Sequence, residues 1–160
     1  MSDFAVRRLT DASRVDELLA LTHGAFRDLA IDPPSSVLKE TAADFAARLE
    51  SDICFVVERD GRLIASVFCS PDGDALYIGR LAVHPDFRRR GIANALVDAA
   101  KAEARRIGMT RLTLGCRIAL PSNVALFRSH GFVVVRETCH AGFTQPTSYD
   151  MEWRSSPSSS

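Results

Sequence analysis

The sequence predicts a mixed α/β fold with a mostly antiparallel sheet and flanking helices. Short apolar runs bounded by turn residues recur along the chain, as expected for strands, and longer segments between them show helical spacing of apolar residues. With 160 residues, of which 46% are hydrophobic, the chain is long enough for one domain with a buried core. We expect that domain to cover residues 1–154 and the serine-rich tail 155–160 to be disordered.

The first half of the chain is expected to supply two helices and the start of the sheet. The expected strands cover residues 4–9, 53–58, 63–69 and 76–83, and the expected helices cover 15–26 and 38–49. Thr10 and Asp11 can cap the first helix, and the Pro33-Pro34 pair separates the two helices. Asp60-Gly61 suits a tight hairpin, so these strands are predicted to form an antiparallel meander.

The second half is dominated by an amphipathic helix expected at residues 91–107. Its apolar stripe includes Ile92, Leu96 and Ala100, and Gly108 stands where a left-handed residue often ends a helix. The elements expected after it are a strand at 111–115, a short helix at 123–130, and strands at 132–138 and 148–153.

Composition excludes several classes of protein. Twenty basic and twenty acidic side chains cancel, which argues against binding to nucleic acid mainly through its phosphates. No apolar run reaches the roughly 18 residues of a membrane span, and the N-terminus lacks the features of a secretory signal. We therefore expect a cytoplasmic protein with no membrane partner.

The four cysteines are scattered and follow no metal-binding spacing. We expect all four to be reduced and no metal site to be present. Cys54 and Cys69 lie in apolar strand-like runs and are interpreted as core residues, whereas an exposed, reactive Cys116 is left open.

A basic turn joins the strand at 76–83 to the helix at 91–107. Pro85 ends the strand, Arg88, Arg89 and Arg90 follow, and Gly91 opens the helix. The first amides of a helix lack intrahelical partners and favour an anion, while glycine allows the backbone to approach phosphate oxygens closely. The pattern indicates a diphosphate site, although a solvated loop before an ordinary helix would leave the same sequence.

Two motifs in this order resemble those of the GCN5-related N-acetyltransferases. Arg88-x-x-Gly91-x-Ala93, after a strand that ends Leu81-Ala82-Val83, is similar to the acetyl-CoA motif of that family. The segment 123–132, which ends in Gly131-Phe132, is similar to the short helix that follows in the family. Two motifs in the family order are far more specific than either one alone.

The resemblance implies the family fold, in which the fourth and fifth strands splay apart to admit the pantetheine of acetyl-CoA. It also implies acetyl-CoA as co-substrate and a backbone bulge between Gly79 and Val83 that frees groups for pantetheine. The residues carried over to the acetyl-CoA site are Leu81, Ala82, Val83, Arg88, Arg89, Arg90, Gly91, Ile92, Ala93, Asn94, Asn123 and Phe127.

The chain departs from the family on the short helix. Phe127 occupies the position at which many members carry a tyrosine that protonates the thiolate, and a phenylalanine cannot do this. Phe127 would instead pack beside pantetheine or in the core. Asn123 lies eight residues before Gly131 rather than the usual eleven, so it would contact the cofactor or only cap the helix.

The resemblance implies transfer of an acetyl group to a primary amine, either of a small molecule or of an exposed amino group. The catalytic acid and base are not identified, and Glu137, His140 and Tyr149 near the final hairpin are candidates. Asp28, Asp32 and Glu40 are candidates for attracting a cationic amine. A module that binds acyl-CoA without turnover and a nucleic-acid binder are the alternative classes, and a homodimer is left open.

Overall fold

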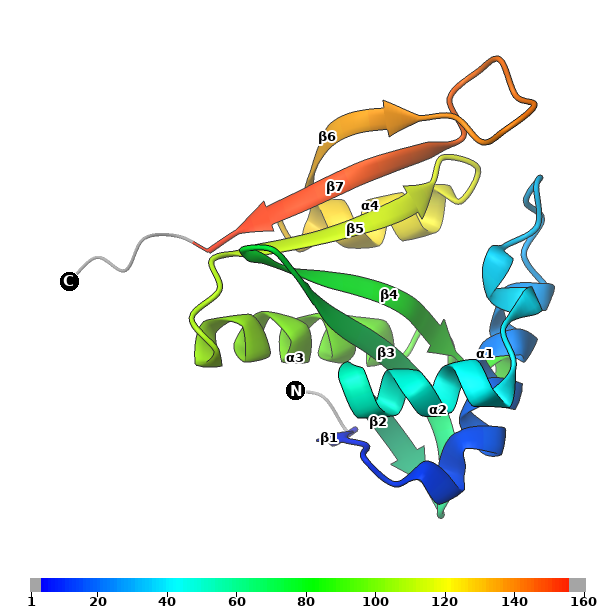
Figure 1. The fold of residues 1–160 in the computed structure, drawn as a ribbon, viewed down its shortest axis with the longest axis vertical. Helices are drawn as coiled ribbons and strands as arrows, with labels where there is room; N and C mark the ends of the chain where they lie inside the picture. The colour runs from blue at the N-terminus through cyan, green and yellow to red at the C-terminus, as the bar shows by residue number, and fades with distance from the viewer. Residues whose placement is uncertain (1–3, 156–160) are drawn as a thin grey trace. The chain divides into compact units, whose positions relative to one another are not determined.

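The computed structural model describes residues 4–155, in which helices and strands follow one another in the predicted order (Figure 1). The elements are β1 (Val6–Arg8), η1 (Ala12–Arg14), α1 (Val15–Arg27), η2 (Ser36–Lys39), α2 (Ala42–Ser51), β2 (Ile53–Arg59), β3 (Arg62–Asp72), β4 (Ala75–Val83), η3 (Pro85–Phe87), α3 (Ile92–Arg106), β5 (Arg111–Arg117), α4 (Pro121–Ser129), β6 (Val133–Thr138) and β7 (Ser148–Arg154). The strand predicted at 4–9 covers only Val6–Arg8, and the helix predicted from Gly91 begins at Ile92.

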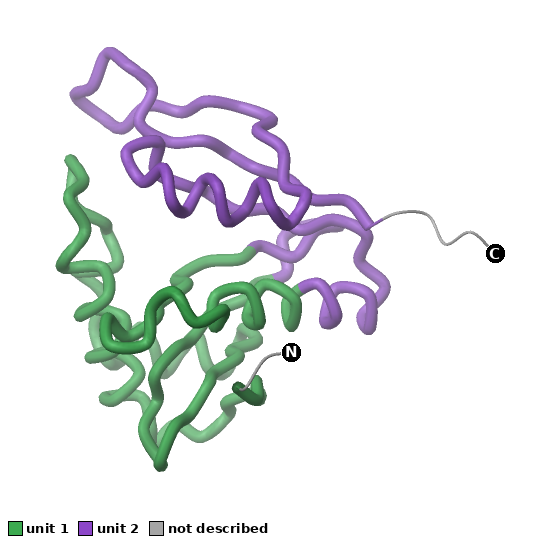
Figure 2. Tube along the Cα trace, turned by 180° about the vertical axis from the view of Figure 1, so that it is seen from behind, with its two compact units in different colours: residues 1–70, 78–100 green, residues 71–77, 101–160 purple. Residues whose placement is uncertain are grey.

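The chain divides into two compact units (Figure 2). Unit 1 comprises residues 1–70 and 78–100, and its strand order is β1-β2-β3-β4. Unit 2 comprises 71–77 and 101–160, and its strand order is β4-β5-β7-β6, with only the first residues of β4 in this unit. The single domain over 1–154 stays a prediction. Disorder was predicted for 155–160, of which 156–160 lie outside the described residues, and the Ser155 amide donates to the Thr110 carbonyl at 2.9 Å.

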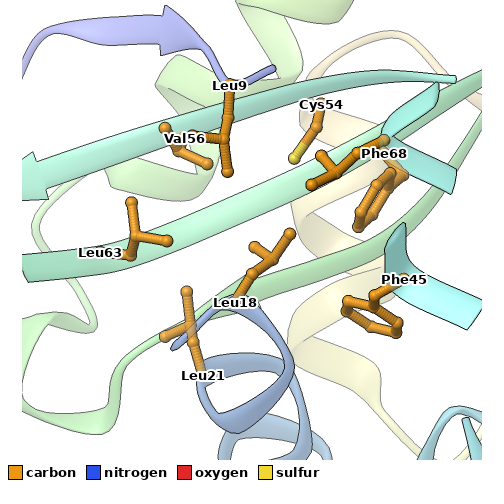
Figure 3. Packing of buried hydrophobic residues seen from close by; sticks show 9 residues of the cluster. Leu9, Leu18, Leu21, Phe45, Cys54, Val56, Leu63 and Phe68 are labelled. Atoms are coloured by element: carbon orange, nitrogen blue, oxygen red, sulfur yellow. The ribbon is translucent and has the colours of Figure 1, made fainter. Parts of the chain in front are cut away.

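The core of unit 1 packs helices α1 and α2 against strands β2 and β3 (Figure 3). Its buried members are Leu9, Leu18, Leu21, Phe45, Leu49, Cys54, Val56, Leu63 and Phe68. The rings of Phe45 and Phe68 meet edge to face, with centroids 5.5 Å apart, an arrangement that aromatic pairs favour. The apolar spacing in the sequence of each helix therefore correctly predicts the face that the helix buries against the strands.

The predicted helix at 38–49 is wrong in one respect, because the structure divides this segment. Leu38 belongs to the 3-10 turn η2, and Glu40 is extended, with φ −74° and ψ 144°. Helix α2 begins only after Thr41, whose side chain accepts a hydrogen bond from the Asp44 amide while the Asp44 carboxylate accepts one from the Thr41 amide. This capping box sets the start of α2 more strongly than the apolar spacing does.

Replacing Thr41 with alanine is expected to lower the free energy of unfolding by about 1 kcal/mol, because the Asp44 amide loses its side-chain acceptor. Urea unfolding of the variant measures this. Thr144→Ala is the control, since Thr144 is exposed and lies in a loop outside any helix cap. Equal stability of the two variants would contradict the assigned role of Thr41.

In unit 2, β7 pairs antiparallel with β5 on one side and with β6 on the other. One face of these strands is apolar, and its buried side chains are Leu112, Leu114, Cys116, Met151 and Trp153. The buried rings of Phe127 and Phe132 add to the core, 5.8 Å apart. The mixed α/β fold with a mostly antiparallel sheet and flanking helices is confirmed.

Candidate functional site

The basic turn has the backbone geometry of an anion site. The first intrahelical hydrogen bond of α3 runs from the Ala95 amide to the Gly91 carbonyl, at 3.1 Å. The amides of Ile92 and Ala93 therefore lie ahead of the first donor and point out of the leading end of the helix. Arg89 and Gly91 both have positive φ, 63° and 80°. Left-handed residues are typical of the backbone turns that bind anions through successive N–H groups.

Positive charge surrounds these amides. Arg88, Arg89 and Arg90 are all exposed, and the guanidinium carbon of Arg90 lies 5.2 Å from the ring centroid of Phe87. A Cβ added to Gly91 would meet no atom within 4 Å, so the space beside this residue is open to a ligand. Residues 88–91 are contiguous in the sequence, and the structure adds the backbone bend at Arg89 and Gly91.

The end of β4 leads into this turn. Ala82 is buried, whereas Leu81 and Val83 are half-buried, and the amide of His84 donates to the Ile64 carbonyl at 2.8 Å. Arg80, just ahead of this stretch, has a φ of 57°, which a non-glycine residue rarely adopts. This irregularity falls inside the segment where a bulge was predicted.

The side chain of Glu40 binds the guanidinium group of Arg80. Glu40 accepts hydrogen bonds from Arg80 Nε at 2.6 Å and Arg80 Nη2 at 2.9 Å, and from Arg48 Nη2 at 2.9 Å. Burial raises the pKa of the Glu40 carboxyl, but the hydrogen bonds from Arg80 and Arg48 outweigh burial and hold this pKa below its ordinary value. The ion pair links the segment before α2 to β4.

This arrangement corrects the interpretation of Glu40 as a residue that attracts a cationic amine. Its carboxylate is already enclosed by two guanidinium groups, and Arg48 also pairs with Asp52 at 3.6 Å, so the charges within the cluster balance and Glu40 has no free negative charge to offer an amine. No local pattern indicates the pair of Glu40 and Arg80, because Arg80 lies forty residues away. Asp28 and Asp32 lie beyond the end of α1, outside this cluster.

Asn123 and Phe127 lie on α4 in unit 2. The N-cap of α4 is Leu120, which makes no side-chain capping bond, and Asn123 is exposed in the first turn. The capping role considered for Asn123 is therefore wrong, since Pro121 starts the helix two residues earlier. Phe127 is buried and packs against Phe132 in the core. A place in the core was one of the two positions predicted for this residue.

The three catalytic candidates gather at the hairpin of β6 and β7. Glu137 and Tyr149 are cross-strand partners, and on the other side Tyr149 pairs in register with Cys116 of β5. His140 follows β6, its amide donates to Thr147 Oγ1 at 3.0 Å, and its Nδ1 also contacts that hydroxyl. Thr147 was missed by sequence reasoning, because only the hairpin brings it to His140.

A second polar surface lies on the side of unit 2 opposite its core. A groove of about 400 Å³ is lined by residues that include Tyr77, Arg111, Arg136, Asp150 and Glu152. Arg136 pairs with Asp150 at 2.6 Å, and Glu152 lies 3.5 Å from Arg111 Nε. These carboxylates are already ion-paired, so the groove does not by itself select a cationic amine.

The cysteines differ sharply in exposure. Cys54, Cys69 and Cys116 are buried and Cys139 is exposed, and none is in a disulfide. Burial raises the pKa of the Cys54 thiol to about 12, with a smaller contribution from Cys69, and that of Cys116 to about 11. The reactive Cys116 that the sequence left open is therefore excluded.

A thiol reagent is expected to modify one cysteine rapidly in the native protein and all four after unfolding. Only the thiolate reacts, and Cys139 alone is exposed. Mass spectrometry after brief maleimide treatment at pH 7.5 identifies the residue, and Cys139→Ser should remove the fast reaction. Rapid modification of Cys116 in the native protein would contradict the described burial.

Within residues 4–155, no cluster of three potential metal ligands occurs. None of the helices in this part of the chain has the length and apolar character needed to cross a bilayer.

Comparisons with known proteins identify the family of this chain. The family model described as the acetyltransferase (GNAT) family matches residues 16–132, from α1 to the start of β6, and includes the basic turn. The chain therefore belongs to the GNAT family.

Curated relatives match over shorter stretches. An acetyltransferase of Pectobacterium atrosepticum is 38% identical over 71 residues, which are 42% of this chain and 48% of the relative. An amino-acid acetyltransferase of Azotobacter vinelandii is 38% identical over 80 residues, which are 48% of this chain and 17% of the relative. The chain thus spans less than half the length of these relatives.

Solved structures match along nearly the whole chain. PaiA N-acetyltransferase from Thermoplasma acidophilum, solved in complex with coenzyme A, has a TM-score of 0.81 at 14% identity, covering 96% of this chain and 99% of that one. The ribosomal-protein-S18-alanine N-acetyltransferase from Escherichia coli has a TM-score of 0.76 at 20% identity, covering 98% and 97%. At these identities the likeness establishes the fold.

Proposed function

We propose that this protein is an acetyl-CoA-dependent N-acetyltransferase. It would move the acetyl group directly to a primary amine of a small molecule or to an exposed amino group. The observation that carries this proposal is the basic turn, where the leading amides of α3, the open space at Gly91 and three exposed arginines favour a diphosphate. Membership of the GNAT family supports it, as does the complex of PaiA with coenzyme A.

Each part of acetyl-CoA has residues suited to it. The diphosphate would lie against the backbone and side chains of residues 88–94, and the pantetheine amides would pair with the backbone of Leu81, Ala82 and Val83. Asn123 and Phe127 complete the set implied by the family. The exposed amide of Asn123 is available to a ligand, whereas burial limits Phe127 to contact at its edge.

In the transfer, the amine nitrogen would form a bond to the thioester carbon while the carbon–sulfur bond breaks. The amine must first lose a proton, and the departing thiolate must gain one. Alignment of the two reactants is worth roughly 7 to 11 kcal/mol of barrier, so the reaction needs no covalent intermediate on the protein.

The hairpin of β6 and β7 supplies the candidates for these proton transfers. Tyr149 has a phenol that can donate to a thiolate, and Glu137 is its cross-strand neighbour. His140 can accept a proton, although Thr147 already contacts its Nδ1. Tyr149→Phe, Glu137→Gln and His140→Ala, each assayed for kcat from pH 6 to pH 9.5, would identify a transferring group by loss of one limb of the profile.

A module that binds acyl-CoA without turnover is the second candidate function. It is favoured by Phe127, which is buried against Phe132 at the position where many family members carry a tyrosine. A nucleic-acid binder that uses the basic turn is disfavoured by the balanced charge of the chain.

Two measurements separate these functions. Calorimetry with acetyl-CoA tests binding, and release of free thiol across a broad panel of primary amines tests transfer. Binding with thiol release from at least one amine supports the enzyme, whereas binding with no release across the panel supports the module. Absence of binding at saturating acetyl-CoA would overturn both.

We also propose a cytoplasmic setting, which the four free cysteines support. A homodimer remains part of this proposal, and sedimentation of the purified protein at several concentrations would test it.

A further inference from the structure

Aromatic rings and guanidinium groups stack beside the basic turn of unit 1. The guanidinium carbon of Arg59, at the end of β2, lies 4.7 Å from the ring centroid of Phe4 and 5.9 Å from that of Phe87. The guanidinium of Arg90 approaches the same Phe87 ring, at 5.2 Å. These distances are within the range of cation–π attraction, so Phe87 is shared by two arginines that lie far apart in the sequence.

Phe87 is held by its own short segment. His84 caps η3: its Nδ1 accepts from the Asp86 amide at 3.1 Å, and its carbonyl accepts from the Phe87 amide at 2.9 Å. The His84 and Phe87 rings also meet edge to face, 5.9 Å apart. Pro85 restricts the backbone at the start of this turn. The ring is therefore fixed from the backbone side, independently of the two arginines that stack on it.

The two arginines at this ring carry charge that the described residues do not balance. Within residues 4–155, neither Arg59 nor Arg90 forms an ion pair, whereas arginines elsewhere in unit 1, such as Arg14 and Arg48, do. The nearby carboxylate of Asp86 lies 3.8 Å from His84 Nδ1 and, within residues 4–155, pairs with neither arginine. Two exposed cations on one ring repel each other, so this arrangement favours a bound anion that lies between them.

We propose that Arg59 is a fourth guanidinium of the phosphate-binding turn and that Phe87 is the positioning residue that holds Arg59 and Arg90 toward it. The ligand group is a phosphate of the nucleotide half of coenzyme A, so this inference rests on the proposed function. A guanidinium presents several N–H donors in a plane and suits phosphate oxygens better than an ammonium does. Arg59 lies outside both family motifs, in the hairpin that joins β2 to β3.

The experiment compares two acetyl donors that differ only in the nucleotide. Acetyl-CoA carries the phosphates, and acetyl-pantetheine lacks them. Arg59→Gln and Phe87→Leu are each expected to weaken acetyl-CoA binding by about fivefold to tenfold, as calorimetry would measure, and to leave kcat/KM with acetyl-pantetheine unchanged. Phe87→Tyr keeps an aromatic face and should retain most of the affinity. Comparison of acetyl-CoA with its 3′-dephospho form shows which phosphate is bound.

The matched control is Arg62→Gln, which removes an exposed arginine from the same hairpin. Unlike Arg59, Arg62 does not stack on an aromatic ring within residues 4–155. This variant should bind acetyl-CoA like the wild type. Equal losses with both acetyl donors, or a loss in Arg62→Gln that matches that in Arg59→Gln, would overturn the proposal. Arg59→Gln with wild-type affinity would overturn it too, even if Phe87→Leu were unstable. Wild-type protein that fails to bind acetyl-CoA refutes the proposed function instead.

Discussion

Replacing Gly91 with glutamate is expected to weaken acetyl-CoA binding about a hundredfold. The new carboxylate would stand in the open space beside the leading amides of α3 and repel a diphosphate by about 3 kcal/mol, and 1.4 kcal/mol corresponds to a factor of ten. Titration calorimetry with acetyl-CoA measures the loss. Since two like charges repel less in salt, part of the affinity should return as the ionic strength rises.

Gly108→Glu is the matched control for backbone strain. Gly108 has a φ of 79°, also has no atom within 4 Å of an added Cβ, and follows the C-terminal end of α3. Both variants force a side chain into the left-handed region, which costs about 1 kcal/mol of stability. If Gly108→Glu reduced binding as strongly as Gly91→Glu, strain rather than position would explain the loss, and the phosphate turn would be misplaced.

Replacing Glu40 with alanine is expected to lower the free energy of unfolding by about 2 to 3 kcal/mol. The change removes the carboxylate that Arg80 and Arg48 share, and Arg48 keeps only its longer contact with Asp52, at 3.6 Å. Breaking a fully buried pair costs about 3 to 5 kcal/mol, and the partial exposure of the arginine side chains, 30% and 17%, reduces this value. Urea unfolding at pH 7 provides the measurement.

The pH dependence gives a second, independent test of Glu40. Its pKa is lowered in the folded protein, so its stabilisation is present above the ordinary value of 4.5 and is lost as pH falls through the folded value. Glu40→Gln mimics the protonated acid. The stability difference between wild type and this variant should therefore be largest near pH 7 and should narrow as the pH falls below 4.5, and a difference that does not change with falling pH would contradict the assignment. Glu50→Gln is the matched control, since Glu50 is an exposed glutamate on α2.

Most elements of the fold could be predicted from the sequence because their signals are local. The strands β2 to β4 and helix α3 have apolar periodicity and turn residues within their own segments, and their bounds agree within a few residues. The helix at 38–49 was mispredicted, since the spacing of Leu38 and Ala42 hid the capping box at Thr41. At α4, Pro121 rather than Asn123 marks the start.

The residues of the candidate site also differ in whether a local pattern in the sequence can reveal their role. Arg88, Gly91 and the first turn of α3 are contiguous, so a motif can reveal them. Phe127 could be named from its spacing to Gly131, but only packing against Phe132 assigned it to the core. His140 could be listed as a candidate, but its contact with Thr147 depends on the hairpin that joins β6 and β7.

By itself, the sequence determined the order of helices and strands, the basic turn at the start of α3 and the family. These depend on residues within a few positions of one another, where spacing alone fixes which side chains share a face. Only the tertiary structure decided that Glu40 is enclosed by Arg48 and Arg80, and that Arg59 and Arg90 meet on the ring of Phe87. Glu40 and Arg48 are eight residues apart, but the contacts that Arg80 and Arg59 make join segments separated by about thirty residues or more. Their pairing follows from how strands and loops pack, which no local pattern records.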